Sequence, residues 1–252
     1  MDKLQKTLLI SLISISAIGW FISKDQPDMM VAMMTYDPLA ILLFTASWTA
    51  GMAAIMFPAV SPMILLYNRL IRSNNGETVG IEKSHPLKMI LFVGCYLAVW
   101  ALTGIALLLA WSIPMNNFLM EIEKNQLQIV YGAILIIAGA YQFTPLKTKC
   151  LGYCESPMSF FMRRWRNGTI GVIKMGTYHG LYCLGCCWPY FLLMVALGWM
   201  NLLFIGLFAG IIFGEKIWSR VILVARMAVI GFIALALITI FVPNKHILFN
   251  II

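Results

Sequence analysis

The sequence predicts an all-α, polytopic transmembrane bundle of about seven spans, with residues 1–252 forming a single integral membrane domain. Composition is the first reason: 61% of the residues are hydrophobic, only 11% are charged and the mean hydropathy is +0.87, far outside the range of soluble globular domains. The second is that the apolar residues form long runs separated by short polar stretches. Helices that satisfy their own backbone hydrogen bonds are the structures that such runs form in lipid.

The apolar runs give the order of the expected spans. They are Leu8 to Ile22, Pro38 to Tyr67, Lys88 to Ile113, Leu127 to Phe143, Thr169 to Met200, Asn201 to Gly214 and Val221 to Phe241. In the second run, Pro58 and Pro62 predict a kink, and each proline frees a carbonyl that needs another partner. The fifth run exceeds the roughly 20 residues of a straight span, so it is tilted, broken at its glycines or partly re-entrant.

The distribution of basic residues supports this topology and sets its orientation. With the N-terminus in the cytoplasm, 14 of the 18 Lys and Arg residues fall on the inner side, three on the outer side and one within a span. This is the positive-inside bias of membrane proteins. Residues 156–167 fit the inner side as an interfacial amphipathic helix on anionic lipid. The net charge of +8 is thereby explained by loops against the lipid bilayer, and no nucleic-acid partner is expected.

Half of the six cysteines and one of the three histidines lie between His179 and Cys187. On a helix, His179, Cys183, Cys186 and Cys187 stand at i, i+4, i+7 and i+8, which is one face. Thiolate and imidazole are ligands that Cu(I) and Zn(II) prefer. The spacing therefore predicts a metal site made by these four residues, although one or two buried thiols could also be simple packing residues.

Other sulfur-containing residues are weaker candidates for the same site. Cys150 and Cys154 follow the fourth span and would join the site if their segment folds back; the topology otherwise places them at the cytoplasmic interface, well above the 179–187 face. Met52 and Met56 share a helical face before Pro58, where packing is the simpler account and lining a copper path is the alternative. Glu215 stands beside Lys216, and ion pairing at a membrane edge is its simplest explanation.

A membrane thiol-disulfide oxidoreductase is the alternative function. Cys183 and Cys186 have the spacing of a redox pair, and Cys150 with Cys154 could be a second pair that exchanges with it. Metal ligation uses His179 and Cys187 as well, whereas redox exchange requires neither. The metal-binding interpretation therefore accounts for more of the cluster.

Three segments resemble a family of bacterial and archaeal proteins described as predicted metal-binding integral membrane proteins of unknown function, sometimes labelled copper chaperones. They are residues 52–63, residues 141–154 and residues 179–188, and the pair Glu215-Lys216 also matches. The resemblance implies a metal-binding protein of the prokaryotic cytoplasmic membrane, with copper as the metal. One departure is Pro189, directly after the cluster, which predicts a break in the helix there.

These observations together predict a non-enzymatic membrane protein that binds copper, with zinc as the alternative metal. The expected role is Cu(I) handling or delivery, with a membrane copper enzyme or a soluble copper carrier as partner. A permanent accessory subunit of a membrane copper enzyme would carry the same residues. Cys183, Cys186 and Cys187 are the first-choice ligands and His179 is the fourth, with Cys150 and Cys154 as the exchange pair.

Overall fold

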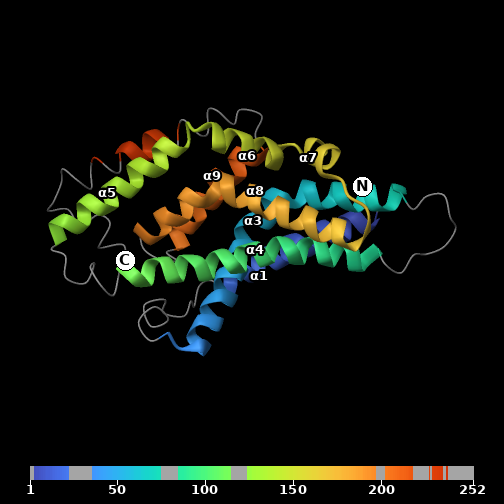
Figure 1. Ribbon diagram of the computed structural model, residues 1–252, viewed down its shortest axis with the longest axis horizontal. Coiled ribbons are helices and arrows are strands. Elements are labelled where there is room, and N and C mark those ends of the chain that lie inside the picture. The colour runs from blue at the N-terminus through green and yellow to red at the C-terminus, as the bar shows by residue number, and fades with distance from the viewer. Residues whose placement is uncertain are drawn as a thin grey trace.

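The computed structural model describes residues 3–22, 36–74, 85–114, 124–196, 202–217, 227, 229–234 and 237. In these residues the protein is all-helical, which confirms the predicted fold class at that level, and they contain no strand. The helices labelled in Figure 1 are α1 (Lys3–Ile22), α3 (Pro38–Asn74), α4 (His85–Pro114), α5 (Lys124–Tyr141), α6 (Pro145–Glu155), α7 (Pro157–Arg164), α8 (Gly168–Ala196) and α9 (Leu202–Ile217).

The long helices α3, α4 and α8 pack side by side, and α1 lies along α3 (Figure 1). Small residues allow these close crossings. A Cβ atom added at Gly176 of α8 would lie 2.5 Å from the Phe92 carbonyl oxygen of α4, and one at Gly180 would lie 2.9 Å from Val99. Close backbone approach at small residues is a common way for helices to pack in membranes. The same crossings place the cysteine face of α8 inside the bundle.

Helix α3 continues through Pro58 and Pro62, and both carbonyls that these prolines free have partners. Pro58 leaves the Ala54 carbonyl without its helical N–H, and the Ser16 hydroxyl of α1 donates a hydrogen bond to it. Pro62 frees the Pro58 carbonyl, which accepts from the Ser61 hydroxyl at 2.9 Å. A buried carbonyl without a partner would cost free energy, so the first of these bonds also fixes α1 against α3.

The break predicted at Pro189 is wrong, because α8 runs without interruption from Gly168 to Ala196. Pro189 frees the Gly185 carbonyl, and the Tyr141 hydroxyl at the end of α5 donates a hydrogen bond to that oxygen. A hydroxyl from a neighbouring helix thus replaces the missing N–H. The sequence analysis expected this long segment to be tilted, broken at its glycines or partly re-entrant. Among the described residues no break at a glycine is found, so His179 to Cys187 lie on one continuous helix.

Two Pro-containing turns start the short helices that follow α5. Thr144 caps α6, its hydroxyl accepting from the Lys147 N–H, and Ser156 caps α7 in the same way through the Ser159 N–H. A proline stands at the first position of each helix, where it costs no hydrogen bond. In α7, Phe160 and Phe161 are buried and two arginines lie in the last turn, as an amphipathic helix requires. The two turns return the chain to α8, and α6 packs against it.

Two helices are long and apolar enough to cross a membrane by length and composition, namely Pro38–Ile71 and Pro86–Ile113. They agree with the second and third predicted spans. The seven-span topology stays a prediction, because within the described ranges no other helix meets both criteria. The predicted last span, Val221 to Phe241, lies mostly outside those ranges, and its described residues 227, 229–234 and 237 are helical.

We expect Gly176→Ala to destabilise the protein by about 1–3 kcal/mol, the usual range for overpacking, because the new methyl group would press on the Phe92 backbone. The matched control is Gly94→Ala on α4, where an added Cβ meets nothing within 4 Å. Thermal unfolding of the detergent-solubilised variants, followed by circular dichroism, measures the difference. Equal melting temperatures for the two variants would contradict the close crossing of α4 and α8.

Candidate sulfur-rich site

The cysteine face of α8 is fully enclosed by the neighbouring helices. Cys183 and Cys186 are 0% exposed, and Cys187 and His179 are 1% exposed. All six cysteines of the chain are free thiols. Helix α6 folds back onto this face and brings Cys150 and Cys154 to it, which is the condition under which the sequence allowed these residues to join the site.

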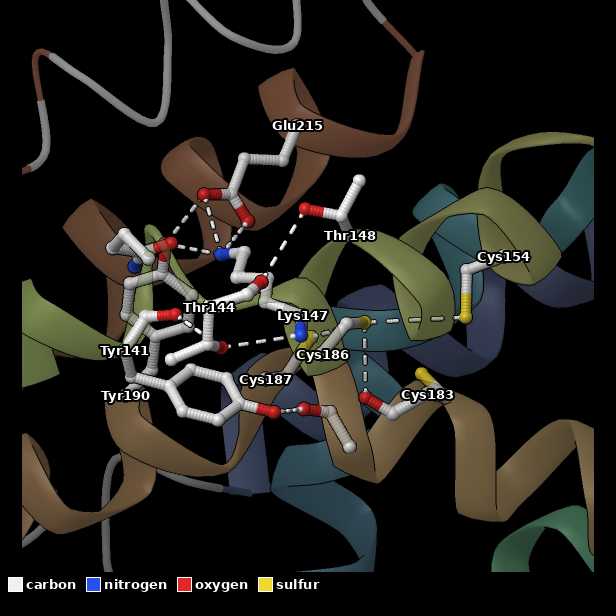
Figure 2. A network of polar contacts seen from close by, with 12 residues as sticks. Tyr141, Thr144, Lys147, Thr148, Cys154, Cys183, Cys186, Cys187, Tyr190 and Glu215 are labelled. Carbon is white, nitrogen blue, oxygen red and sulfur yellow. Dashed lines mark hydrogen bonds and ion pairs between the residues drawn. The ribbon is translucent and has the colours of Figure 1, made fainter.

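Cys186 lies at the centre of a group of three thiols. Its Sγ atom is 3.3 Å from the Sγ of Cys187 and 3.9 Å from the Sγ of Cys154, and it also donates to the Cys183 carbonyl at 3.1 Å (Figure 2). Cys154 therefore belongs with the α8 cysteines. The expected separation in depth between the Cys150/Cys154 pair and the 179–187 face is wrong, because the turns around α6 place its buried side directly on α8.

The Cys183 sulfur points to a different set of neighbours. Its Sγ atom lies 3.8 Å from the Met56 Sδ of α3, 3.3 Å from the Tyr96 hydroxyl of α4 and 2.9 Å from the Lys216 ammonium of α9. Lys216 Nζ is also 3.7 Å from the Met56 Sδ. Four helices thus meet at one thiol, and Met56 is the methionine whose sulfur reaches the cysteines.

A buried ion pair borders the thiols. The Lys147 ammonium of α6 contacts both carboxylate oxygens of Glu215 at 2.8 Å, and the Tyr190 hydroxyl donates to the same carboxylate at 2.7 Å (Figure 2). Gln142 donates to the Tyr190 hydroxyl at 2.8 Å. Glu215 is consequently paired with Lys147 and not with its neighbour in sequence, and the pair is buried within the protein.

His179 is buried among aromatic rings and does not join the sulfur atoms. Its ring centroid lies 5.2 Å from that of Tyr96, 5.6 Å from that of Phe160 and 6.1 Å from that of Phe92. Among the described residues neither ring nitrogen has a hydrogen-bond partner. Its position four residues before Cys183 places the imidazole about one helical turn away, where α4 and α7 supply rings. Its role as fourth ligand stays a prediction.

Cys150 and Met52 occupy the edges of the site. A Cβ atom added at Gly185 would lie 2.7 Å from the Cys150 Sγ, so this thiol lies directly on the α8 backbone. Burial raises the pKa of the Cys150 thiol, and the nearby Cys186 adds to the shift. Met52 is buried on α3, one turn before Met56, and its role in lining a copper path stays a prediction.

Lys216, Tyr96, Lys147 and Tyr190 are site residues that the sequence analysis did not single out for this place. Lys147 counts there only as an inner-side charge, and Lys216 counts as an inner-side charge and as the expected ion-pair partner of Glu215. The sequence does hold one signal, because an acidic and a basic residue end an otherwise apolar run in Glu215-Lys216, and buried charges are expensive unless they have partners. Their partners could not be read from the sequence, since they come from distant helices.

The donor set fits a soft cation. It contains four thiols and one thioether, Cys154, Cys183, Cys186, Cys187 and Met56, which are connected by the sulfur contacts of Cys183 and Cys186 and by the helical turn between these two residues. Thiolate and thioether sulfur select Cu(I) over harder ions. As the side chains stand, the described residues contain no group of three or more Cys, His, Asp or Glu side chains that could hold a metal ion. Thiols that bind one would have to turn from their present partners.

Comparison with known protein families identifies the family of the chain at a coarse level. A family model described as a copper chaperone, PpoB2, matches residues 45–239, which include every cysteine of the chain and both residues of the Lys147–Glu215 pair. No curated protein and no solved structure matches the chain.

We expect Lys147→Met to lower the free energy of unfolding by about 3–5 kcal/mol, because it leaves the Glu215 carboxylate buried without its cation. Replacing both partners, as Lys147→Met with Glu215→Leu, should recover much of the loss. Lys149→Met is the matched control, since Lys149 is exposed on the same helix. Denaturation of the purified variants in detergent tests this, and equal stability of Lys147→Met and Lys149→Met would contradict the buried pair.

Proposed function

Because the chain belongs to the PpoB2 copper chaperone family, we propose that it binds Cu(I) within the membrane through its buried sulfur atoms and hands the ion to a copper protein. Membership of the family indicates copper handling in general. The residues, the oxidation state and the setting of the site are our proposal, and the observation that carries it is the contact of Cys183 with Met56 beside the Cys154, Cys186 and Cys187 thiols.

Two features of the site favour Cu(I) as the cargo, with Zn(II) as the alternative metal. All donors in contact with one another are sulfur, which is soft and polarisable. The Glu215 carboxylate, which borders the thiols, is already held by Lys147 and Tyr190, so it is not free to act as a hard ligand. The thioether of Met56 has no proton to lose, whereas each thiol that binds as a thiolate releases one proton. Copper binding therefore depends on pH through the cysteines.

The membrane setting is supported by the outward-facing side chains. Large apolar residues stand exposed along the outer faces of several helices, for example Phe21 of α1 at 77%, Ile90 of α4 at 69% and Ile170 of α8 at 70%. So much exposed apolar surface suits contact with lipid. We propose the seven-span arrangement in the cytoplasmic membrane of a prokaryote, with the N-terminus in the cytoplasm and the arginines of α7 at the inner surface.

The proposed role is delivery and not catalysis. A membrane copper enzyme is the proposed receiver, and a soluble copper carrier is the proposed source or alternative receiver. Permanent residence as an accessory subunit of such an enzyme requires the same sulfur site. Cys150 and Cys154 lie on a short helix between turns, and we propose them as the pair through which copper is exchanged, with Cys154 passing it to Cys186.

Thiol-disulfide exchange is a second candidate, and one contact favours it. The Cys186 sulfur touches two other thiols, those of Cys187 and Cys154, so a disulfide formed at Cys186 could pass from one helix to another. The pairs differ from those expected, since the sequence favoured Cys183 with Cys186. An oxidant or acceptor for the electrons would have to be a separate redox partner.

We expect the wild-type protein, purified without oxygen, to bind about one Cu(I) per chain, and Cys183→Ser combined with Cys186→Ser to lose it. Removing both thiols takes away the Met56 and Cys187 contacts at once. Cys95→Ser is the matched control, since Cys95 is a thiol of α4 outside the cluster. Elemental analysis with thiol counting on the same samples is the measurement.

Unchanged copper in the double variant would show that these cysteines do not form the site. Absence of metal from wild type together with reducible pairs of cysteines would favour thiol-disulfide exchange instead.

We expect a reporter fused after Arg166 to lie in the cytoplasm, because the basic end of α7 should stay on the inner side. A reporter fused after Glu123, directly before α5, should lie outside. Enzyme reporters that are active on only one side of the membrane make the comparison. An external position for the first reporter would overturn the proposed topology.

A further inference from the structure

A cation already occupies the place between two of the proposed copper ligands. The Lys216 ammonium lies 2.9 Å from the Cys183 Sγ and 3.7 Å from the Met56 Sδ, and these two sulfurs are 3.8 Å apart. The three atoms form a compact triangle with Nζ at one corner. Because the ammonium donates to Cys183, a lone pair of that sulfur points at the cation, as it would point at a metal ion.

This position is unusual for a lysine. Lys216 is 5% exposed, and in the described part of the chain its ammonium has no carboxylate partner, since the adjacent Glu215 is turned to Lys147. An ammonium is strongly hydrated, so burying it beside sulfur costs more than pairing it with a carboxylate. The position of the ammonium beside the two sulfurs therefore costs free energy. Helix α9 nevertheless holds Lys216 there, although the Glu215 carboxylate is adjacent to it in the sequence.

We propose that the Lys216 ammonium is a resident cation of the Met56–Cys183 sulfur pair, and that Cu(I) reaches these two sulfurs by displacing it. This inference rests on the proposed function, since it concerns the same site and cargo. It adds a competitor that belongs to the chain itself. The ammonium leaves the sulfur pair as Cu(I) arrives, the proton of the Cys183 thiol is released to solvent as its sulfur binds, and no covalent bond of Lys216 is made or broken.

The surrounding structure allows the ammonium to move while its backbone stays in place. Glu215 is held by the Lys147 ammonium and the Tyr190 hydroxyl, which anchors the last turn of α9 (Figure 2). The four-carbon stem of Lys216 is flexible. Lys216 is also the penultimate residue of α9, and the end of a helix where carbonyls lack partners is favourable for a positive charge. The displaced ammonium thus has a nearby place to go.

Competition of this kind suits a protein that must release its cargo. When copper leaves, the ammonium can return to the sulfur pair, so the emptied site still contains a cation. The affinity for Cu(I) is then lower than the sulfur atoms alone would give, because displacing the Lys216 ammonium from them costs free energy that opposes binding. Removing the ammonium should consequently strengthen binding.

The test is the Cu(I) affinity of Lys216→Met, measured by competition with a chromogenic Cu(I) chelator under anaerobic conditions. We expect the dissociation constant to fall about tenfold or more relative to wild type, which corresponds to about 1.4 kcal/mol. Lys174→Met is the matched control, since it removes an exposed lysine of α8 and should leave the affinity unchanged. Met56→Leu, which removes a ligand and keeps the lysine, should weaken binding.

Lys216→Gln is a second variant of similar length, in case Lys216→Met is not recovered from membranes, and it should also bind Cu(I) more tightly. Equal or weaker binding by both Lys216 variants, with wild type still binding copper, overturns the resident-cation inference alone. A loss of affinity that Lys216→Arg restores overturns it as well, because the positive charge would then support the ligands. No binding of Cu(I) by wild type overturns the proposed function itself.

Discussion

The arrangement of the site depends on the buried ion pair between Lys147 and Glu215. A carboxylate enclosed at 1% exposure needs a cation, and α6 can supply one only by lying against α9. This requirement fixes the short helix that carries Cys150 and Cys154, and it places the Cys154 sulfur on Cys186. It also anchors the end of α9, so that the next residue, Lys216, reaches into the bundle from the same turn. Two adjacent charges thereby organise both groups of sulfur atoms.

A second constraint is that prolines within helices leave buried carbonyl groups without N–H donors, so each of these carbonyls needs a hydrogen-bond donor from elsewhere. In α3 the Ser16 hydroxyl of another helix satisfies the Ala54 carbonyl, and in α8 the Tyr141 hydroxyl satisfies the Gly185 carbonyl. Each bond therefore preserves a long helix and joins it to a neighbour. For α8 the consequence reaches the site, because the helix stays continuous beside the three cysteines and Tyr141 ties the end of α5 to them.

The chemistry of the site follows from its sulfur atoms and from the cation among them. The donors are soft, connected across α3, α6 and α8, and closed off from water. A site that only stored copper would gain from leaving its ligands free. Here Cys183 is engaged by an ammonium and Cys186 by a backbone carbonyl. If these cysteines are the copper ligands, they must first leave their present partners and so bind less tightly, which agrees with the proposed delivery of copper.

The sequence by itself determined the helical class, the family and the grouping of the cysteines. Composition and apolar runs require helices, and the spacing from 179 to 187 places four side chains on one helical face. Residues 52–63, 141–154 and 179–188 carried the resemblance, and the family match over residues 45–239 confirms it. These properties are local, because a helix fixes the angles between its own residues whatever surrounds it.

The tertiary structure decided which partners each of those side chains meets. On the shared face of α8, His179 turned out to contact rings, Cys183 a methionine and a lysine, and Cys186 two other thiols. Cys186 and Cys154 are 32 residues apart, and Lys216 and Met56 are 160 residues apart. Periodicity carries no information about such contacts. They arise where separate helices pack, and there the cost of burying a charge or a free carbonyl selects the neighbour.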